Sequence, residues 1–159
     1  MKNISYSLAT LNDLEDLVES RVFFLTEFWG EQPETAVMEL RQNLRSYFQS
    51  SMEEGAYVSF IARENGTWVG VGGMAIRHQP GNFKNPSGKV CYIMNMCTLP
   101  SHRRNGICSK ILDLLTGHGK SLGITMFELH ATKEGEMVYP KHGFTKHSEP
   151  TYRKHLTLA

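Results

Sequence analysis

The stretch LPSHRRNGICSK, residues 99–110, follows an apolar run and precedes a helical pattern. It places two adjacent arginines, Arg103 and Arg104, at the expected start of that helix. Positive side chains are unfavourable there, because the N-terminal end of a helix carries a partial positive charge. An anion would remove this conflict, and the free backbone N–H groups of a helix start bind phosphate well where a glycine such as Gly106 allows close approach. The stretch therefore predicts a strand, a turn with an anion site, and a helix.

Periodicity on both sides of this stretch predicts a mixed α/β domain. Before it we expect a strand at Ile4–Ala9, and then a helix that begins at Asn12, where Glu15 completes a capping pattern. A second helix is expected from Pro33 to just before Gly55. A hairpin over 56–78, which turns at Asn65-Gly66, and a strand over 90–99 are expected to follow. After it we expect a helix over 106–122, a strand over 125–131, a short helix over 134–141 and two strands flanking Pro150. Asn105 is expected to help cap the helix that follows it.

Composition limits the classes of function. A chain of 159 residues predicts one domain, and 17 basic against 16 acidic residues give a net charge of only +1. That balance argues against broad attraction to nucleic acid or to a membrane surface. Three cysteines without a C-x-x-C pair predict reduced thiols in a cytoplasmic protein, with neither a disulfide framework nor a zinc cluster. The N-terminal residues lack a continuous apolar run, so we expect no signal peptide. We also expect no membrane span, and the histidines lack the spacing of metal ligands.

Two blocks of sequence carry a resemblance to a known family. Arg103, Gly106 and Cys108 occupy the three defined positions of [RQ]-x-x-G-x-[GA], the acyl-CoA-binding signature of the GNAT superfamily of N-acetyltransferases, with cysteine where the family has glycine or alanine. The second block, ATKEGEMVYPKHGF, is similar to the family's later segment, and its Tyr139 and Gly143-Phe144 match that pattern. The two blocks stand in the family's order and separation.

The resemblance implies a fold and a reaction. The fold would be a mostly antiparallel central sheet with one splayed parallel strand pair, flanked by about four helices. The reaction would move an acetyl group from acetyl-CoA to a primary amine of a small molecule or peptide, by direct attack on the thioester. Backbone groups of the signature strand would hold the pantetheine arm and the thioester carbonyl, and the following turn would hold the pyrophosphate. The implied cofactor-binding residues are Met96, Cys97, Thr98, Arg103, Arg104, Asn105, Gly106, Ile107, Cys108, Ser109 and Thr132.

Two side chains are the catalytic candidates. Tyr139 is the candidate general acid, since a phenol stays protonated at neutral pH and can donate to a departing thiolate. His130 is the candidate general base, because an imidazole titrates near neutrality. The signature strand often carries a glutamate in this family and here offers Asn95, while His78 and Glu27 are further candidates for the base.

Alternatives remain open on the residues alone. A non-catalytic acyl-CoA-binding sensor or partner domain would share the same signature, although it would not need the phenol of Tyr139. The aromatic cluster Phe23, Phe24, Phe28 and Trp29 is either core or the lining of an acceptor pocket. The resemblance also allows a homodimer.

Overall fold

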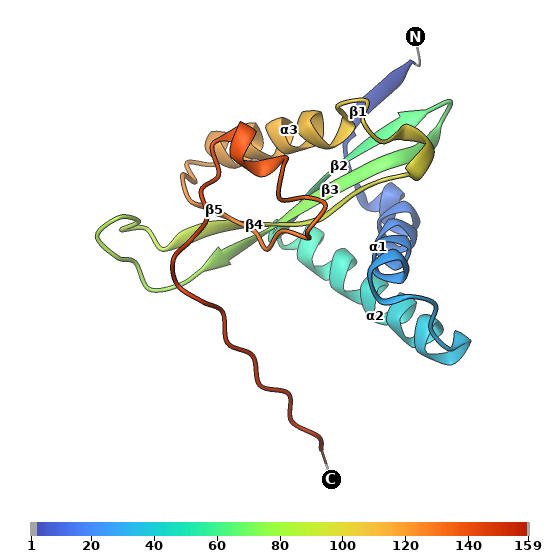
Figure 1. The fold of residues 1–159 in the computed structure, drawn as a ribbon, viewed down its shortest axis with the longest axis horizontal. Coiled ribbons are helices and arrows are strands. Elements are labelled where there is room, and N and C mark those ends of the chain that lie inside the picture. The colour runs from blue at the N-terminus through green and yellow to red at the C-terminus, as the bar shows by residue number, and fades with distance from the viewer. Residues whose placement is uncertain (1–2, 159) are drawn as a thin grey trace.

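The computed structural model describes residues 3–158 and consists of a five-stranded mixed sheet with helices on both faces (Figure 1). The strands are β1 (Ile4–Leu8), β2 (Tyr57–Glu64), β3 (Thr67–His78), β4 (Lys89–Thr98) and β5 (Phe127–Glu128), and they lie in sequence order across the sheet. Their first three pairings are antiparallel, whereas β4 and β5 are parallel. The described helices are α1 (Leu14–Trp29), α2 (Glu34–Glu53) and α3 (Ile107–Ser121), with short 3-10 turns η1 (Leu11–Asp13), η2 (Pro100–His102) and η3 (Tyr139–His142).

Two apolar cores lie on opposite faces of the sheet. On one face α1 and α2 bury Leu17, Val18 and Phe48 against it. On the other face α3 buries Ile111, Leu112 and Leu115. Figure 1 shows this arrangement, with α3 on the side of the sheet opposite α1 and α2. Burial on both faces explains why β3 and β4 are apolar along most of their length.

Glycines on β3 allow α3 to lie close to the sheet. A Cβ atom built on Gly72 would come within 2.6 Å of Cγ2 of Ile111 and closer still to Sδ of Met96. A Cβ atom on Gly70 would clash in the same way with Ile107 in the first turn of α3. The helix start is therefore pressed against the sheet at the level where β4 ends.

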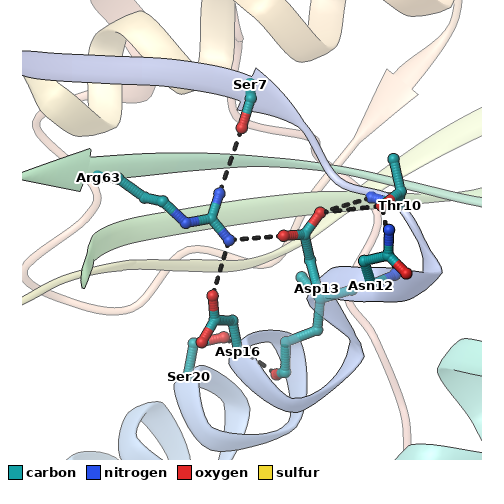
Figure 2. Close-up of polar contacts among 8 residues, drawn as sticks. Ser7, Thr10, Asn12, Asp13, Asp16, Ser20 and Arg63 are labelled. Carbon is teal, nitrogen blue, oxygen red and sulfur yellow. Dashed lines mark hydrogen bonds and ion pairs between the residues drawn. The ribbon is translucent and has the colours of Figure 1, made fainter. Parts of the chain in front are cut away.

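The start of α1 is held by a partly buried cluster of ion pairs (Figure 2). Arg63 on β2 donates to Asp13 and Asp16, each at 2.7 Å, and to Ser7 on β1 at 3.2 Å. Asp13 also accepts from the backbone N–H of Thr10 and so closes a capping box at η1. The cap expected at Asn12 is therefore wrong, because Thr10 fills that role two residues earlier.

A β-bulge interrupts β4. Val71 pairs with Cys97 and Gly73 pairs with Met94, so Gly72 of β3 lies opposite both Asn95 and Met96. Asn95 has a φ of 62°, a left-handed conformation that asparagine tolerates better than most residues. Met94 packs in the core beside α1 and α2, and Asn95 contacts Arg21 on α1. Two consecutive side chains therefore point to the same face of the sheet.

Three expectations about the elements are wrong. The described chain has three α-helices rather than about four, because residues 134–138 form turns that continue only into the 3-10 turn η3, where Gly135 and Pro140 disfavour a longer helix. The strand expected over 125–131 is reduced to Phe127–Glu128. The two strands expected around Pro150 do not form, and residues 145–158 are exposed and run away from the sheet (Figure 1).

Candidate active site

The parallel pair β4 and β5 opens after only two paired positions. Cys91 pairs with Phe127 and Tyr92 with Glu128, and β5 ends there while β4 continues to Thr98. Residues 93–98 of β4 therefore have no strand partner on that side within the described chain. Such a strand edge offers free backbone N–H and C=O groups to an extended ligand. The predicted splayed pair is present, and it lies where Met96, Cys97 and Thr98 were expected to hold a cofactor.

Thr98 supplies a polar group that has no partner. Its side-chain hydroxyl is buried and makes no hydrogen bond to any described residue. Thr98 lies opposite Gly70 on the face that α3 covers, whereas Cys97 faces α1 and sits in the other core. Buried hydroxyls are normally hydrogen-bonded. The end of β4 is thus a place where a polar ligand group would complete the hydrogen bonding.

The loop from β4 to α3 presents backbone N–H groups. Arg104 and Gly106 both have positive φ angles, 63° and 75°, which turn the chain sharply into the helix. No side chain caps α3, so the N–H groups in its first turn are left for a ligand or solvent. Ile107 is buried, so only its backbone can take part. The turn and the uncapped helix start expected from the sequence are present, and binding of an anion there stays a prediction.

The two arginines of this loop have different surroundings. The guanidinium of Arg103 donates to the backbone oxygen of Thr98 at 3.0 Å and to a carboxylate oxygen of Glu27 at 2.5 Å, so it ties the loop to β4 and α1. Arg104 is exposed and has no hydrogen-bond or ion-pair partner among residues 3–158. Arg104 is therefore the freer of the two to meet an anion.

Asn105 does not cap α3. Its side-chain amide donates to the backbone oxygen of His102 at 3.1 Å, and Gly106 is the N-cap residue. The expectation of a capping role was wrong, because the left-handed turn at Gly106 separates Asn105 from the helix start.

Sequence reasoning missed the residue that anchors this loop. His102 is 8% exposed, and its Nε2 lies 2.9 Å from a carboxylate oxygen of Glu64 on β2, while its Nδ1 lies 2.8 Å from the hydroxyl of Ser101. The contact joins the loop to a strand 38 residues earlier in the chain. The only local signal was a histidine next to the arginines, which does not reveal a distant carboxylate partner.

Tyr139 lies at the start of η3 and packs against the α3 core. Its ring stands edge-on to Phe144, with centroids 5.9 Å apart. Its hydroxyl makes no hydrogen bond within the described chain. Burial, with a smaller effect from the thiol of Cys108, raises the pKa of Tyr139 to about 12. Thr132 begins the turn that leads to Tyr139: its side-chain hydroxyl accepts from the N–H of Gly135.

His130 lies just beyond β5, and both of its ring nitrogens have partners. Nδ1 is 2.7 Å from the hydroxyl of Tyr92, and Nε2 is 3.2 Å from the hydroxyl of Thr151. Of the other candidates for the base, Glu27 is bound by Arg103, and His78 ends β3. Each of these groups remains a hypothesis for the base.

The family model of the acetyltransferase (GNAT) family matches residues 14–144, most of the chain. The protein belongs to the GNAT acetyltransferase family. A solved structure described as a predicted acetyltransferase with acetyl-CoA, from Clostridium acetobutylicum, is similar at a TM-score of 0.87 and 30% identity, and 96% of each chain is covered.

Other solved structures share the fold at lower identity. A GCN5-related N-acetyltransferase from Ralstonia eutropha JMP134 has a TM-score of 0.83 at 22% identity, with 96% of this chain and 99% of that chain covered. The glucosamine-6-phosphate N-acetyltransferase from Arabidopsis thaliana has a TM-score of 0.71 at 17% identity, with 96% and 98% covered. At these identities the likeness shows the fold alone. No curated protein matched the sequence.

The aromatic cluster of this GNAT acetyltransferase divides between two surroundings. Phe23 packs edge-on against Trp68, and Phe24 joins the core beside α1 and α2. Trp29 is 70% exposed and borders a cavity of about 290 Å³ between α1 and α2. Phe28 lies against it at the exposed end of α1. The prediction of core packing is therefore correct for Phe23 and Phe24. For Phe28 and Trp29, a role in lining the acceptor pocket remains a hypothesis.

The described residues contain neither a membrane-spanning helix nor a metal-binding cluster. No described helix is both long and apolar enough to cross a membrane. The described residues contain no group of three histidine, cysteine or acidic side chains placed to hold a metal ion.

Proposed function

We propose that this GNAT acetyltransferase moves an acetyl group from acetyl-CoA to a primary amine of a small molecule or peptide. The observation that carries the proposal is the opening between β4 and β5, which ends at an uncapped helix start. The free edge of β4 suits the amide-rich pantetheine arm, and the turn before α3 suits a pyrophosphate. Acetyl-CoA supplies the activated acetyl group when it is bound.

The residues at this site have defined parts in the proposal. Backbone N–H groups near Met96 and Cys97 would donate to the thioester carbonyl and stabilise the negative charge that develops on its oxygen. Arg104, with the backbone of residues 105–109, would bind the pyrophosphate, and the unpartnered hydroxyl of Thr98 would bond to the pantetheine arm.

Proton transfer would need an acid and a base. Tyr139 holds its proton firmly because its pKa is raised, and its free hydroxyl can donate to the leaving thiolate. His130 is proposed to take the proton of the attacking amine, which requires Nδ1 to exchange its present bond with Tyr92. The amine must be neutral to attack, so this transfer precedes or accompanies bond formation.

The direct test is acetyl-CoA-dependent thiol release with a panel of amines, supported by mass spectrometry of the product. We expect at least one amine to gain an acetyl group. Binding of acetyl-CoA, measured as a rise in melting temperature, provides the control, because a ligand of the folded state stabilises it. A rise in melting temperature with no acetylated amine would favour the alternative, a non-catalytic acyl-CoA-binding domain. No rise at millimolar acetyl-CoA would reject both.

A further inference from the structure

The β4 bulge is next to a half-buried arginine that has no carboxylate partner. Arg21 on α1 donates from Nη1 to Oδ1 of Asn95 at 3.2 Å, and its guanidinium lies 5.6 Å from the ring centroid of Phe24. No ion pair involves Arg21 among residues 3–158, whereas four other arginines each pair with a carboxylate: Arg41, Arg45, Arg63 and Arg103. Withdrawing a cation from water is unfavourable unless an opposite charge compensates it.

Two deeply buried groups beside Arg21 also have polar atoms without a partner. The hydroxyl of Tyr57 and the side-chain amide nitrogen of Asn95 make no hydrogen bond to any described residue, and both residues are 3% exposed. They are neighbours: the Tyr57 hydroxyl lies over Gly73 of β3, which pairs with Met94, the residue before Asn95. Asn95, Ser59 and Arg21 each act to lower the pKa of Tyr57, but burial dominates and raises it. Tyr57 comes from β2, Asn95 from β4 and Arg21 from α1.

This cluster has more donors than acceptors. Arg21 can only donate, and the Asn95 amide carries two hydrogens. The Asn95 carbonyl oxygen accepts one hydrogen bond from Arg21, and the Ser59 hydroxyl is near enough to Tyr57 to accept the phenol proton. Most of the five N–H donors of Arg21 and at least one Asn95 amide hydrogen would still need acceptors. A group with several acceptor oxygens and a negative charge satisfies these needs together.

The cluster lies beside the proposed reaction centre. Asn95 is two residues before Cys97, and Cys97 contacts the backbone oxygen of Ser20, the residue before Arg21. Two residues of a strand span about 7 Å. If the anionic group of a substrate binds Arg21, an amine a few bonds from that group in the same molecule would therefore reach a thioester held at Met96 and Cys97.

We propose that Arg21, with Asn95 and Tyr57, binds an anionic oxygen group of the acceptor, so that the substrate is a small amine with a carboxylate or phosphate a few bonds from its nitrogen. This inference rests on the proposed function and specifies its substrate class. The chemistry shared by the two kinds of substrate is a charged group with several acceptor oxygens, which a guanidinium fork recognises.

The test uses matched pairs of amines that differ in charge. L-alanine is compared with L-alaninamide, and O-phosphoethanolamine with ethanolamine, by calorimetric titration into protein saturated with CoA. We expect the anionic member of at least one pair to bind roughly tenfold to a hundredfold more tightly, as for charge-assisted hydrogen bonds. The pair that shows the difference identifies carboxylate or phosphate as the recognised group. Equal binding within both pairs would overturn the inference.

Variants assign that preference to Arg21. Arg21→Gln should abolish it and Arg21→Lys should keep part of it, because the charge remains while the planar fork is lost. Arg45→Gln is the matched control: it removes the same charge from an exposed arginine in the same helical layer and should leave the preference intact. A melting temperature raised by acetyl-CoA checks that each variant is folded. A preference that survives Arg21→Gln would contradict the assignment.

Acetyl transfer with the same four amines separates the two proposals. Tight, charge-dependent binding without acetylated product would reject the proposed function and leave the anion site standing. Acetylation at equal kcat/KM within both pairs would support the function and reject the anion site.

Discussion

At the scale of single residues, the two catalytic candidates differ in how available their polar atoms are. The hydroxyl of Tyr139 has no hydrogen bond within the described chain, and burial raises its pKa to about 12. It therefore remains a proton donor throughout the neutral range. His130, in contrast, has a partner at each ring nitrogen. This contrast makes the two roles separable by mutation.

We expect Tyr139→Phe to lower kcat by about 100-fold or more, because general acid catalysis contributes roughly that much. The ring that packs on Phe144 is kept, so acetyl-CoA binding should change by no more than about twofold. Steady-state kinetics and titration with acetyl-CoA measure the two quantities. Unchanged kcat would remove Tyr139 from the role of acid.

We expect His130→Gln to lower kcat by about tenfold or more if the imidazole takes the amine proton. Thr151→Val removes only the Nε2 contact and should leave most of the activity. A wild-type rate in His130→Gln would exclude this base and direct attention to Glu27 or His78.

The individual residues also show what sequence alone could reach. The signature stretch correctly predicted a turn at Gly106 followed by a helix, because glycine and helix-start patterns are local properties. It could not show that Arg103 binds Glu27, that His102 binds Glu64, or that Arg21 meets Asn95. These partners are 76, 38 and 74 residues apart, and they meet only because the sheet and α1 bring them together.

At the scale of elements, the strongly periodic segments were predictable and the weakly paired ones were not. α1, α2, α3 and the hairpin of β2 and β3 appear near their predicted bounds, since each buries a regular apolar face. β5 is short because it leaves β4, and no pattern in residues 125–131 reports that divergence. The segment expected as a helix over 134–141 forms turns and the 3-10 turn η3, because Gly135 and Pro140 lie within it.

Two glycine substitutions should test the close contact between α3 and the sheet. We expect Gly72→Ala to reduce the free energy of unfolding by about 1–3 kcal/mol, because the added carbon would overlap Met96 and Ile111. Gly117→Ala is the matched control, because Gly117 lies on the exposed face of α3 and nothing lies within 4 Å of the added carbon. It should raise stability by up to about 1 kcal/mol, since alanine favours a helix. Urea denaturation of both variants measures the difference, and destabilisation by both or by neither would contradict this account.

At the scale of the whole molecule, buried thiols and phenols link stability to pH. Burial raises the pKa of Cys97 and of Tyr139 to about 12 and that of Cys91 to about 11, and it also raises the pKa of Tyr57. The folded protein thus holds these protons more firmly than the unfolded chain. Their stabilising contribution is complete below about pH 9 and is lost as pH rises towards the folded-state pKa values.

We therefore expect the free energy of unfolding to fall steadily as pH rises from about 9 to 11. Denaturant titrations followed by circular dichroism at several pH values measure this fall. Cys97→Ala should show a shallower dependence than the wild type, because one buried acid is removed. A free energy of unfolding that is constant or rises over this range would show that burial does not raise the pKa values of these groups.

The course of the C-terminal segment was the least predictable part of the fold. Two strands were expected on either side of Pro150, but residues 145–158 form no strand. A strand needs a partner as well as an alternating pattern, and a pattern alone does not supply one. The structure places α1 and α2 on one face of the sheet and α3 on the other, which the element order had left open.

The bulge in β4 changes how positions along that strand should be counted. Before it, Ile93 packs in the core under α3 and Met94 in the core beside α1. At the bulge Asn95 also faces α1, so that Met96 then packs under α3 and Cys97 beside α1. Deleting a single residue at the bulge would thus exchange the two faces for the rest of the strand, moving Thr98 away from α3. Transplanting a substrate site between such chains accordingly depends on insertions and deletions in β4 as much as on which amino acids are chosen.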